Sequence, residues 1–109
     1  MVSINDFAAI DIRIGKIVGI EEHSAARKPM YKLVVDFGAE IGKRTIIAGI
    51  RALYSQEELL GRKVACVVNL EPKMIAGIES QGMLLAAGDE SSISILVPYR
   101  DVEIGSRIR

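Results

Sequence analysis

The segment from residue 10 to residue 22 restricts the possible folds more than any other part of the chain. Asp11 and Arg13 have one parity, and the opposite parity carries the β-branched residues Ile10, Ile12, Ile14, Val18 and Ile20. Such alternation predicts a long strand with one buried face. Gly15 and Gly19 would weaken a flat strand, so we expect them to let it bulge and curl, as small barrels require.

Further apolar runs follow, separated by polar turns and glycines. They predict strands at residues 30–37, 43–48, 63–70, 83–87 and 93–98. In the first of these runs, one face should carry Tyr31, Leu33, Val35 and Phe37. The C-terminal tail also alternates, with apolar residues at 102, 104 and 108, so we expect it to dock on the barrel itself or on a partner subunit.

Two serines mark the starts of short helices. Ser3 has a capping-type acidic residue three positions later, and Ser55 begins a capping box. Leu59 and Leu60 would form the apolar face of the second helix, and Gly61 would end it. Five or six curled strands, with this helix between the third and fourth, predict an all-β, five-stranded Greek-key barrel of the oligonucleotide-binding (OB) type. Its 109 residues are expected to form a single domain, 1–109.

Several classes of chemistry lack support in the sequence. The only cysteine, Cys66, lies in an apolar run and is expected to be a small buried hydrophobe. The only histidine, His23, lies in a polar turn and is expected to be solvated. One His and one Cys cannot supply a zinc site, and no phosphate-binding loop or nucleophile motif occurs. We therefore predict no metal, no cofactor and no catalytic residues.

The chain also lacks the signals of membrane insertion or export. No apolar run approaches the roughly 20 residues of a spanning helix, and the first residues do not resemble a signal peptide. We expect a cytoplasmic protein with no membrane insertion.

A polar surface accompanies the second strand and the segment 67–87. The net charge is zero, with 14 basic and 14 acidic residues, so binding of nucleic acid would need a local basic face. Amide and hydroxyl side chains can donate to and accept from a base or a ribose, and methionine offers a polarizable surface to a base. An ordinary solvated face and a core methionine are the alternatives. The candidate binding residues are Arg27, Lys28, Lys32, Asn69, Lys73, Ser80, Gln81 and Met83.

Aromatic residues are scarce: the chain has two Phe, three Tyr and no Trp. A long stacking platform for a single strand is therefore not expected. The surface suits a folded RNA, held through its phosphates and a few protruding bases or ends.

Two motifs carry a specific resemblance to a known family. Val68-Asn-Leu and Glu79-Ser-Gln-Gly-Met, together with Asp11-Ile-Arg-Ile-Gly-Lys-Ile, resemble the tRNA-binding OB-fold domain. This domain occurs as a free-standing homodimer, at the C-terminus of bacterial methionyl-tRNA synthetases and in synthetase-associated cytokine precursors. The resemblance implies a homodimer that binds tRNA by shape and that assists an aminoacyl-tRNA synthetase, for example methionyl-tRNA synthetase. It also implies that the tRNA-contacting face carries Lys32, Asn69, Lys73, Ser80, Gln81 and Met83.

Other segments are similar to CsaA-type export chaperones, which are small dimers of the same fold thought to hold unfolded preproteins. The similarity is carried by Ala25-Ala-Arg-Lys-Pro-Met-Tyr-Lys-Leu and Lys73-Met-Ile-Ala-Gly. Those chaperones usually depart from the motif at Glu79 to Met83, which this chain keeps. The sequence therefore predicts tRNA binding as the first function and a chaperone for unfolded preproteins as the alternative.

Overall fold

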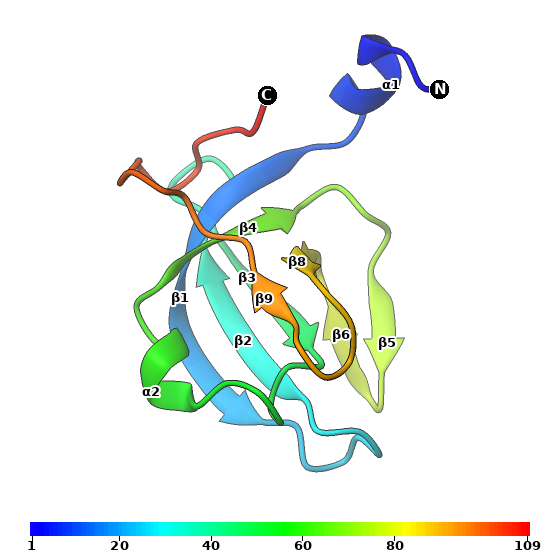
Figure 1. Cartoon of the computed structure of the whole chain (residues 1–109), viewed down its shortest axis with the longest axis vertical. Coiled ribbons are helices and arrows are strands. Elements are labelled where there is room, and N and C mark those ends of the chain that lie inside the picture. The colour runs from blue at the N-terminus through cyan, green and yellow to red at the C-terminus, as the bar shows by residue number, and fades with distance from the viewer.

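A computed structural model describes all 109 residues of the chain. The elements follow in the order α1 (Ile4–Ala8), β1 (Ile12–Glu22), β2 (Tyr31–Asp36), β3 (Lys43–Ala48), α2 (Gln56–Leu59), β4 (Lys63–Val67), β5 (Lys73–Ile75), β6 (Ile78–Ser80), β7 (Met83–Leu84), β8 (Ala86–Ala87) and β9 (Ser94–Ile95). The main sheet has the antiparallel order β3-β2-β1-β4-β7, and the other strands form the pairs β5–β6 and β8–β9. Figure 1 shows how strongly the main sheet curves around the core. The expected all-β barrel, with a short helix between the third and fourth strands, is confirmed. No helix has the length and apolar character needed to cross a bilayer.

Strand β1 curls because it contains a bulge. Its first part pairs with β4 and its second part with β2, and the register to β2 shifts between Ile17 and Gly19. Ile17 is fully buried, whereas Val18 is 41% exposed. The expectation that Val18 shares the buried face with Ile20 is therefore wrong, because Val18 is the extra residue at the bulge, and Ile17 and Ile20 pack on the core on either side of it.

The buried face of β2 is as expected, because Tyr31, Leu33, Val35 and Phe37 all belong to the core. Cys66 on β4 is also fully buried, as expected, and burial raises the pKa of its thiol to about 12. The thiol is therefore protonated and unreactive at neutral pH.

Both helices begin with the expected capping boxes. The Ser3 hydroxyl accepts a hydrogen bond from the Asp6 amide, and the Ser55 hydroxyl accepts one from the Glu58 amide. Leu59 is fully buried, but Leu60 is 55% exposed. Leu60 therefore does not belong to the apolar face of the helix, since α2 makes only one turn and buries a single side chain.

The second half of the chain differs most from the sequence expectation. The run 83–87 is divided between β7, which pairs with β4, and β8, which pairs with β9. The β5–β6 hairpin was not expected. Its two-residue turn has positive φ angles at Ala76 (47°) and Gly77 (87°). Asn or Asp would usually mark the first of these positions, so the alanine gave no signal for a turn.

The C-terminal tail docks on the barrel itself, which was one of the two alternatives. The Ile14 amide donates to the Ser106 carbonyl oxygen over 2.9 Å, and the Gly105 amide donates to the Ile14 carbonyl oxygen over 2.7 Å. The Ile108 amide donates to the Ile12 carbonyl oxygen over 2.8 Å. The tail thus pairs with the first part of β1, on the edge that β2 leaves free.

One ion pair at the start of β1 should make stability depend on pH. The Asp11 carboxylate accepts hydrogen bonds from Arg13 Nε (2.6 Å) and Nη2 (3.2 Å), and this pairing holds the pKa of Asp11 below its ordinary value of 3.8. Its stabilising contribution is therefore complete above pH 3.8 and is lost as the pH falls through the lower pKa of the folded state.

We expect Asp11→Asn to be less stable than the wild type by about 1 kcal/mol at pH 7, which is the scale of one partly exposed charged hydrogen bond. The difference should shrink as the pH falls below 3.8. Urea unfolding of both proteins at pH 7 and pH 3 measures it, and an equal difference at the two pH values would contradict the assignment.

Candidate nucleic-acid interface

A groove of about 550 Å³ lies between β3, the β5–β6 hairpin and β7, and we refer to it as the hairpin groove. Most of its surface is apolar, and its two charged lining residues are Glu71 and Lys73. The residues that line it include Ile47, Leu70, Lys73, Ile75, Ser80 and Met83. Three of the eight predicted binding residues, Lys73, Ser80 and Met83, are therefore brought together here.

Two predicted binding residues hold the base of the hairpin against β3. The Ser80 side chain is buried, and its hydroxyl accepts from the Ile47 amide (3.0 Å) and donates to the Gly82 carbonyl oxygen (3.2 Å). Gln81 Oε1 accepts a hydrogen bond from the backbone amide of Thr45 over 2.9 Å. The backbone amide of Gln81 donates to the Thr45 carbonyl oxygen over 2.7 Å. The side-chain oxygens of Ser80 and Gln81, which the sequence suggested for RNA, thus have partners inside the fold.

Asn69 has a similar internal role at the end of β4. Its Oδ1 accepts from the Asp11 amide, and its Nδ2 donates to the Ala9 carbonyl oxygen, each over 2.8 Å. The side chain therefore fixes the link between α1 and β1. Sequence reasoning missed this role because both partners are backbone groups about 60 residues away.

The predicted basic residues differ in whether an acidic side chain pairs with them. Arg27 and Lys28 are exposed in the loop between β1 and β2, and Lys73 is exposed at the start of β5. None of the ion pairs in the structure involves these three residues. Lys32 Nζ, in contrast, lies 3.1 Å from the Glu21 carboxylate.

Lys32 nevertheless belongs to the same surface as the hairpin groove. It lies directly opposite Ile47 in the β2–β3 register, and side chains of opposite residues share a face of the sheet. Ile47 lines the groove. Figure 1 shows the loop between β1 and β2 at the end of the barrel where the β5–β6 hairpin turns. The basic residues thus come from three elements, and one of them, Lys73, lines the groove itself.

His23 overturns a sequence expectation. It is only 4% exposed, and its Nε2 donates a hydrogen bond to the Ile75 carbonyl oxygen over 2.8 Å. The prediction of a solvated histidine is therefore wrong. No local signal could have revealed this contact, because the partner is a backbone group in a hairpin 52 residues later.

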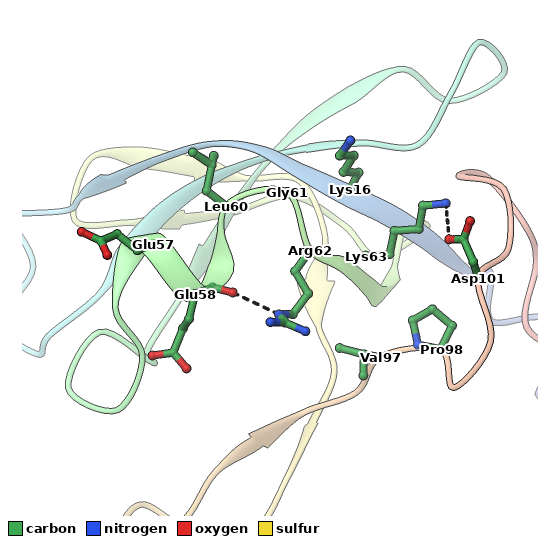
Figure 2. A pocket seen from close by; sticks show the side chains of 10 residues that line it. All are labelled: Lys16, Glu57, Glu58, Leu60, Gly61, Arg62, Lys63, Val97, Pro98 and Asp101. Atoms are coloured by element: carbon green, nitrogen blue, oxygen red, sulfur yellow. Dashed lines mark hydrogen bonds and ion pairs between the residues drawn. The ribbon is translucent and has the colours of Figure 1, made fainter.

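A second groove, of about 690 Å³, lies between α2 and the C-terminal segment (Figure 2). Lys63 Nζ donates to Asp101 over 2.7 Å, which holds the pKa of Asp101 below its ordinary value, and Arg62 Nε donates to the Glu58 carbonyl oxygen. Because acidic and basic groups alternate around this groove, it offers little net attraction to a polyanion. The hairpin groove is the better candidate for binding nucleic acid.

Sequence comparison relates the chain to proteins that handle tRNA. The family described as "Putative tRNA binding domain" matches residues 12–107. The methionine-tRNA ligase of Pyrococcus furiosus is 49% identical over 108 residues, which cover 99% of this chain and 14% of the ligase. That of Methanoculleus marisnigri is 50% identical over 109 residues, which cover 100% of this chain and 16% of the ligase. The chain therefore spans about one seventh of the length of these curated relatives.

Solved structures share the fold over the whole chain. The CsaA chaperone protein from Picrophilus torridus has a TM-score of 0.94 and 38% identity, with 100% of both chains covered. The MetRS related protein from Pyrococcus horikoshii has a TM-score of 0.89 and 35% identity, with 100% of this chain and 98% of that chain covered. These similarities confirm the expected OB-type barrel and the resemblance to both groups of proteins.

Proposed function

Because this chain belongs to the tRNA-binding domain family, we propose that it binds tRNA by its structure, with little dependence on sequence, and assists an aminoacyl-tRNA synthetase. The observation that carries the proposal is the set of unpaired basic side chains, Arg27, Lys28 and Lys73, beside a largely apolar groove. Basic side chains hold the phosphates of a folded RNA, and an apolar groove accepts a base that protrudes from it. Methionyl-tRNA synthetase is the partner that the relatives favour.

The eight candidate residues divide into two roles in this proposal. Four basic residues contact phosphates, and Met83, which is 47% exposed, packs against a protruding base. Ser80 and Gln81 hold the backbone that frames the groove, and Asn69 holds the link between α1 and β1. The phosphate contacts are Arg27, Lys28, Lys32 and Lys73.

Salt dependence tests this proposal. Four basic side chains per chain that contact phosphates predict that log K for tRNA falls with log salt with a slope of about −2.8 to −3.6, since each neutralised phosphate contributes about −0.7 to −0.9. Titration of labelled tRNA between 50 and 300 mM salt would measure the slope. The proposal would be wrong if tRNA did not bind at low salt, or if its affinity did not change with salt concentration.

We also propose that the chain, as a single domain, forms a homodimer. An apolar groove of about 340 Å³ lies between β1, β4 and the C-terminal tail. Its lining includes Leu96, Val97, Val102 and Ile108, all of which are partly exposed. Pairing of this groove with a second copy would cover these side chains and place two basic sites on one particle, which raises the affinity for tRNA through avidity.

Light scattering should therefore give about twice the chain mass of 11.9 kDa. Leu96→Glu is expected to give the monomer mass and weaker tRNA binding, because a buried unpaired carboxylate opposes association. Leu60→Glu changes a leucine outside this groove that is 55% exposed, compared with 43% for Leu96, and should leave the dimer intact. A monomeric wild type would refute the dimer.

A chaperone for unfolded preproteins is the second candidate, and the character of the hairpin groove favours it. Leu70 and Met83 line this groove and are each 47% exposed, and flexible methionines adapt to varied apolar side chains. The proposal predicts that an equimolar dimer suppresses aggregation of a chemically denatured client. A client that aggregates at the same rate with and without the protein would count decisively against it.

A further inference from the structure

Two polar side chains are buried in this protein, and both hold the β5–β6 hairpin. They are Ser80, 5% exposed, and His23, 4% exposed. Ser80 ties the base of the hairpin to β3 through the Ile47 amide. His23 reaches the other end, because its Nε2 donates to the carbonyl oxygen of Ile75, the residue just before the turn.

His23 also closes the loop that carries two of the basic residues. Its amide donates to the Met30 carbonyl oxygen over 3.0 Å, and its carbonyl oxygen accepts from the Ala26 amide over 3.2 Å. The loop between these contacts contains Arg27 and Lys28. The backbone of His23 therefore closes the basic loop, and its side chain binds the hairpin.

Little else holds these two segments in place relative to each other. The strands of the hairpin have three residues each, and an isolated two-stranded hairpin is only marginally stable in water. The side-chain contacts of Ser80 and Gln81 secure the base of the hairpin and leave its tip to His23. Ile75 also lines the hairpin groove, so the same contact sets the position of one wall.

We propose that His23 is a positioning residue for RNA, because it fixes the spacing between the basic loop, with Arg27 and Lys28, and Lys73 on the hairpin. The inference rests on the proposed tRNA binding. Because His23 holds this spacing in the free protein, the basic loop and the hairpin can both contact phosphates of one RNA without first losing conformational entropy. Without it, the loop and the hairpin tip move independently, and each must be ordered when the RNA binds.

His23→Leu and His23→Gln test the role of the hydrogen bond. Leucine fills space but cannot donate, whereas the amide nitrogen of glutamine can donate from a position close to that of Nε2. We expect the Kd for tRNA to rise about five- to tenfold for His23→Leu, the scale of one lost hydrogen bond, and to stay within about twofold for His23→Gln. If His23→Leu does not fold, His23→Asn replaces it, because its amide is one carbon shorter.

A matched control separates positioning from loss of stability. Leu59→Ala removes a fully buried side chain on α2, which has no hydrogen bond to the hairpin or the basic loop, and it destabilises the fold. At a temperature where all variants are folded, its Kd for tRNA should equal that of the wild type. Hydrogen exchange of the free protein should be faster for the β5–β6 amides in His23→Leu only.

The outcomes distinguish this inference from the function on which it rests. Unchanged tRNA affinity of His23→Leu, or a His23→Gln variant as weak as His23→Leu, would overturn the positioning role. Unchanged hydrogen exchange in the hairpin of His23→Leu would overturn it as well, even where the wild type binds tRNA. A wild type that does not bind tRNA overturns the function and the inference together, whatever hydrogen exchange shows.

Discussion

Lys32→Glu combined with Lys73→Glu is expected to weaken tRNA binding by about 30-fold or more at low salt while leaving the fold intact. About 1 kcal/mol for each reversed charge beside a phosphate gives this factor. The fold should tolerate the change because Lys73 has no ion-pair partner and the surface pair of Lys32 with Glu21 contributes little. A fluorescence titration of tRNA and a urea unfolding curve measure the two quantities.

The control for this variant carries the same change in net charge on other surfaces. Lys16→Glu combined with Arg109→Glu alters one lysine that lines the second groove (Figure 2) and the exposed C-terminal residue. We expect its affinity for tRNA to stay within about threefold of the wild type. If both double variants lose affinity equally, total charge governs binding and the hairpin groove is not the interface.

Gly15→Ala is expected to lower the free energy of unfolding by about 2 to 3 kcal/mol, through overpacking of the core. A Cβ atom at this position would lie 2.5 Å from Val35 Cγ1 and 2.6 Å from Phe37 Cε1. Val35 and Phe37 are both buried in the core, so neither can move away cheaply. The midpoint of urea unfolding at constant m-value measures the change.

Gly42→Ala separates the packing effect from the general cost of replacing glycine. Gly42 has a positive φ of 80°, and a Cβ atom there would meet open space. Only backbone strain applies, so we expect a loss of about 1 kcal/mol. Losses of equal size at Gly15 and Gly42 would show that close packing does not explain the glycine in β1.

Much of the architecture could be predicted from local patterns. The buried face of β2, the two capping boxes, the burial of Cys66 and the bulge of β1 beside Gly19 all follow from neighbouring residues. Prediction from local patterns fails where the alternation of residues in a strand is interrupted by a bulge. Val18 has the parity of a core residue, but the bulge turns it outward, and the position of a bulge depends on the partner strand.

The sequence by itself determined the class of fold, the family and the residue types available for binding, because alternation, capping and short motifs depend on residues close together in the chain. Only the tertiary structure decided which of the candidates are free to contact RNA. The side-chain oxygens of Asn69, Ser80 and Gln81 accept hydrogen bonds from backbone amides far away in the chain, while Lys73 keeps a free charge at the groove. The contact of His23 with Ile75 was decided in the same way. Any residue can supply a backbone carbonyl, so the side chain that reaches one gives no signal of its partner before the chain folds.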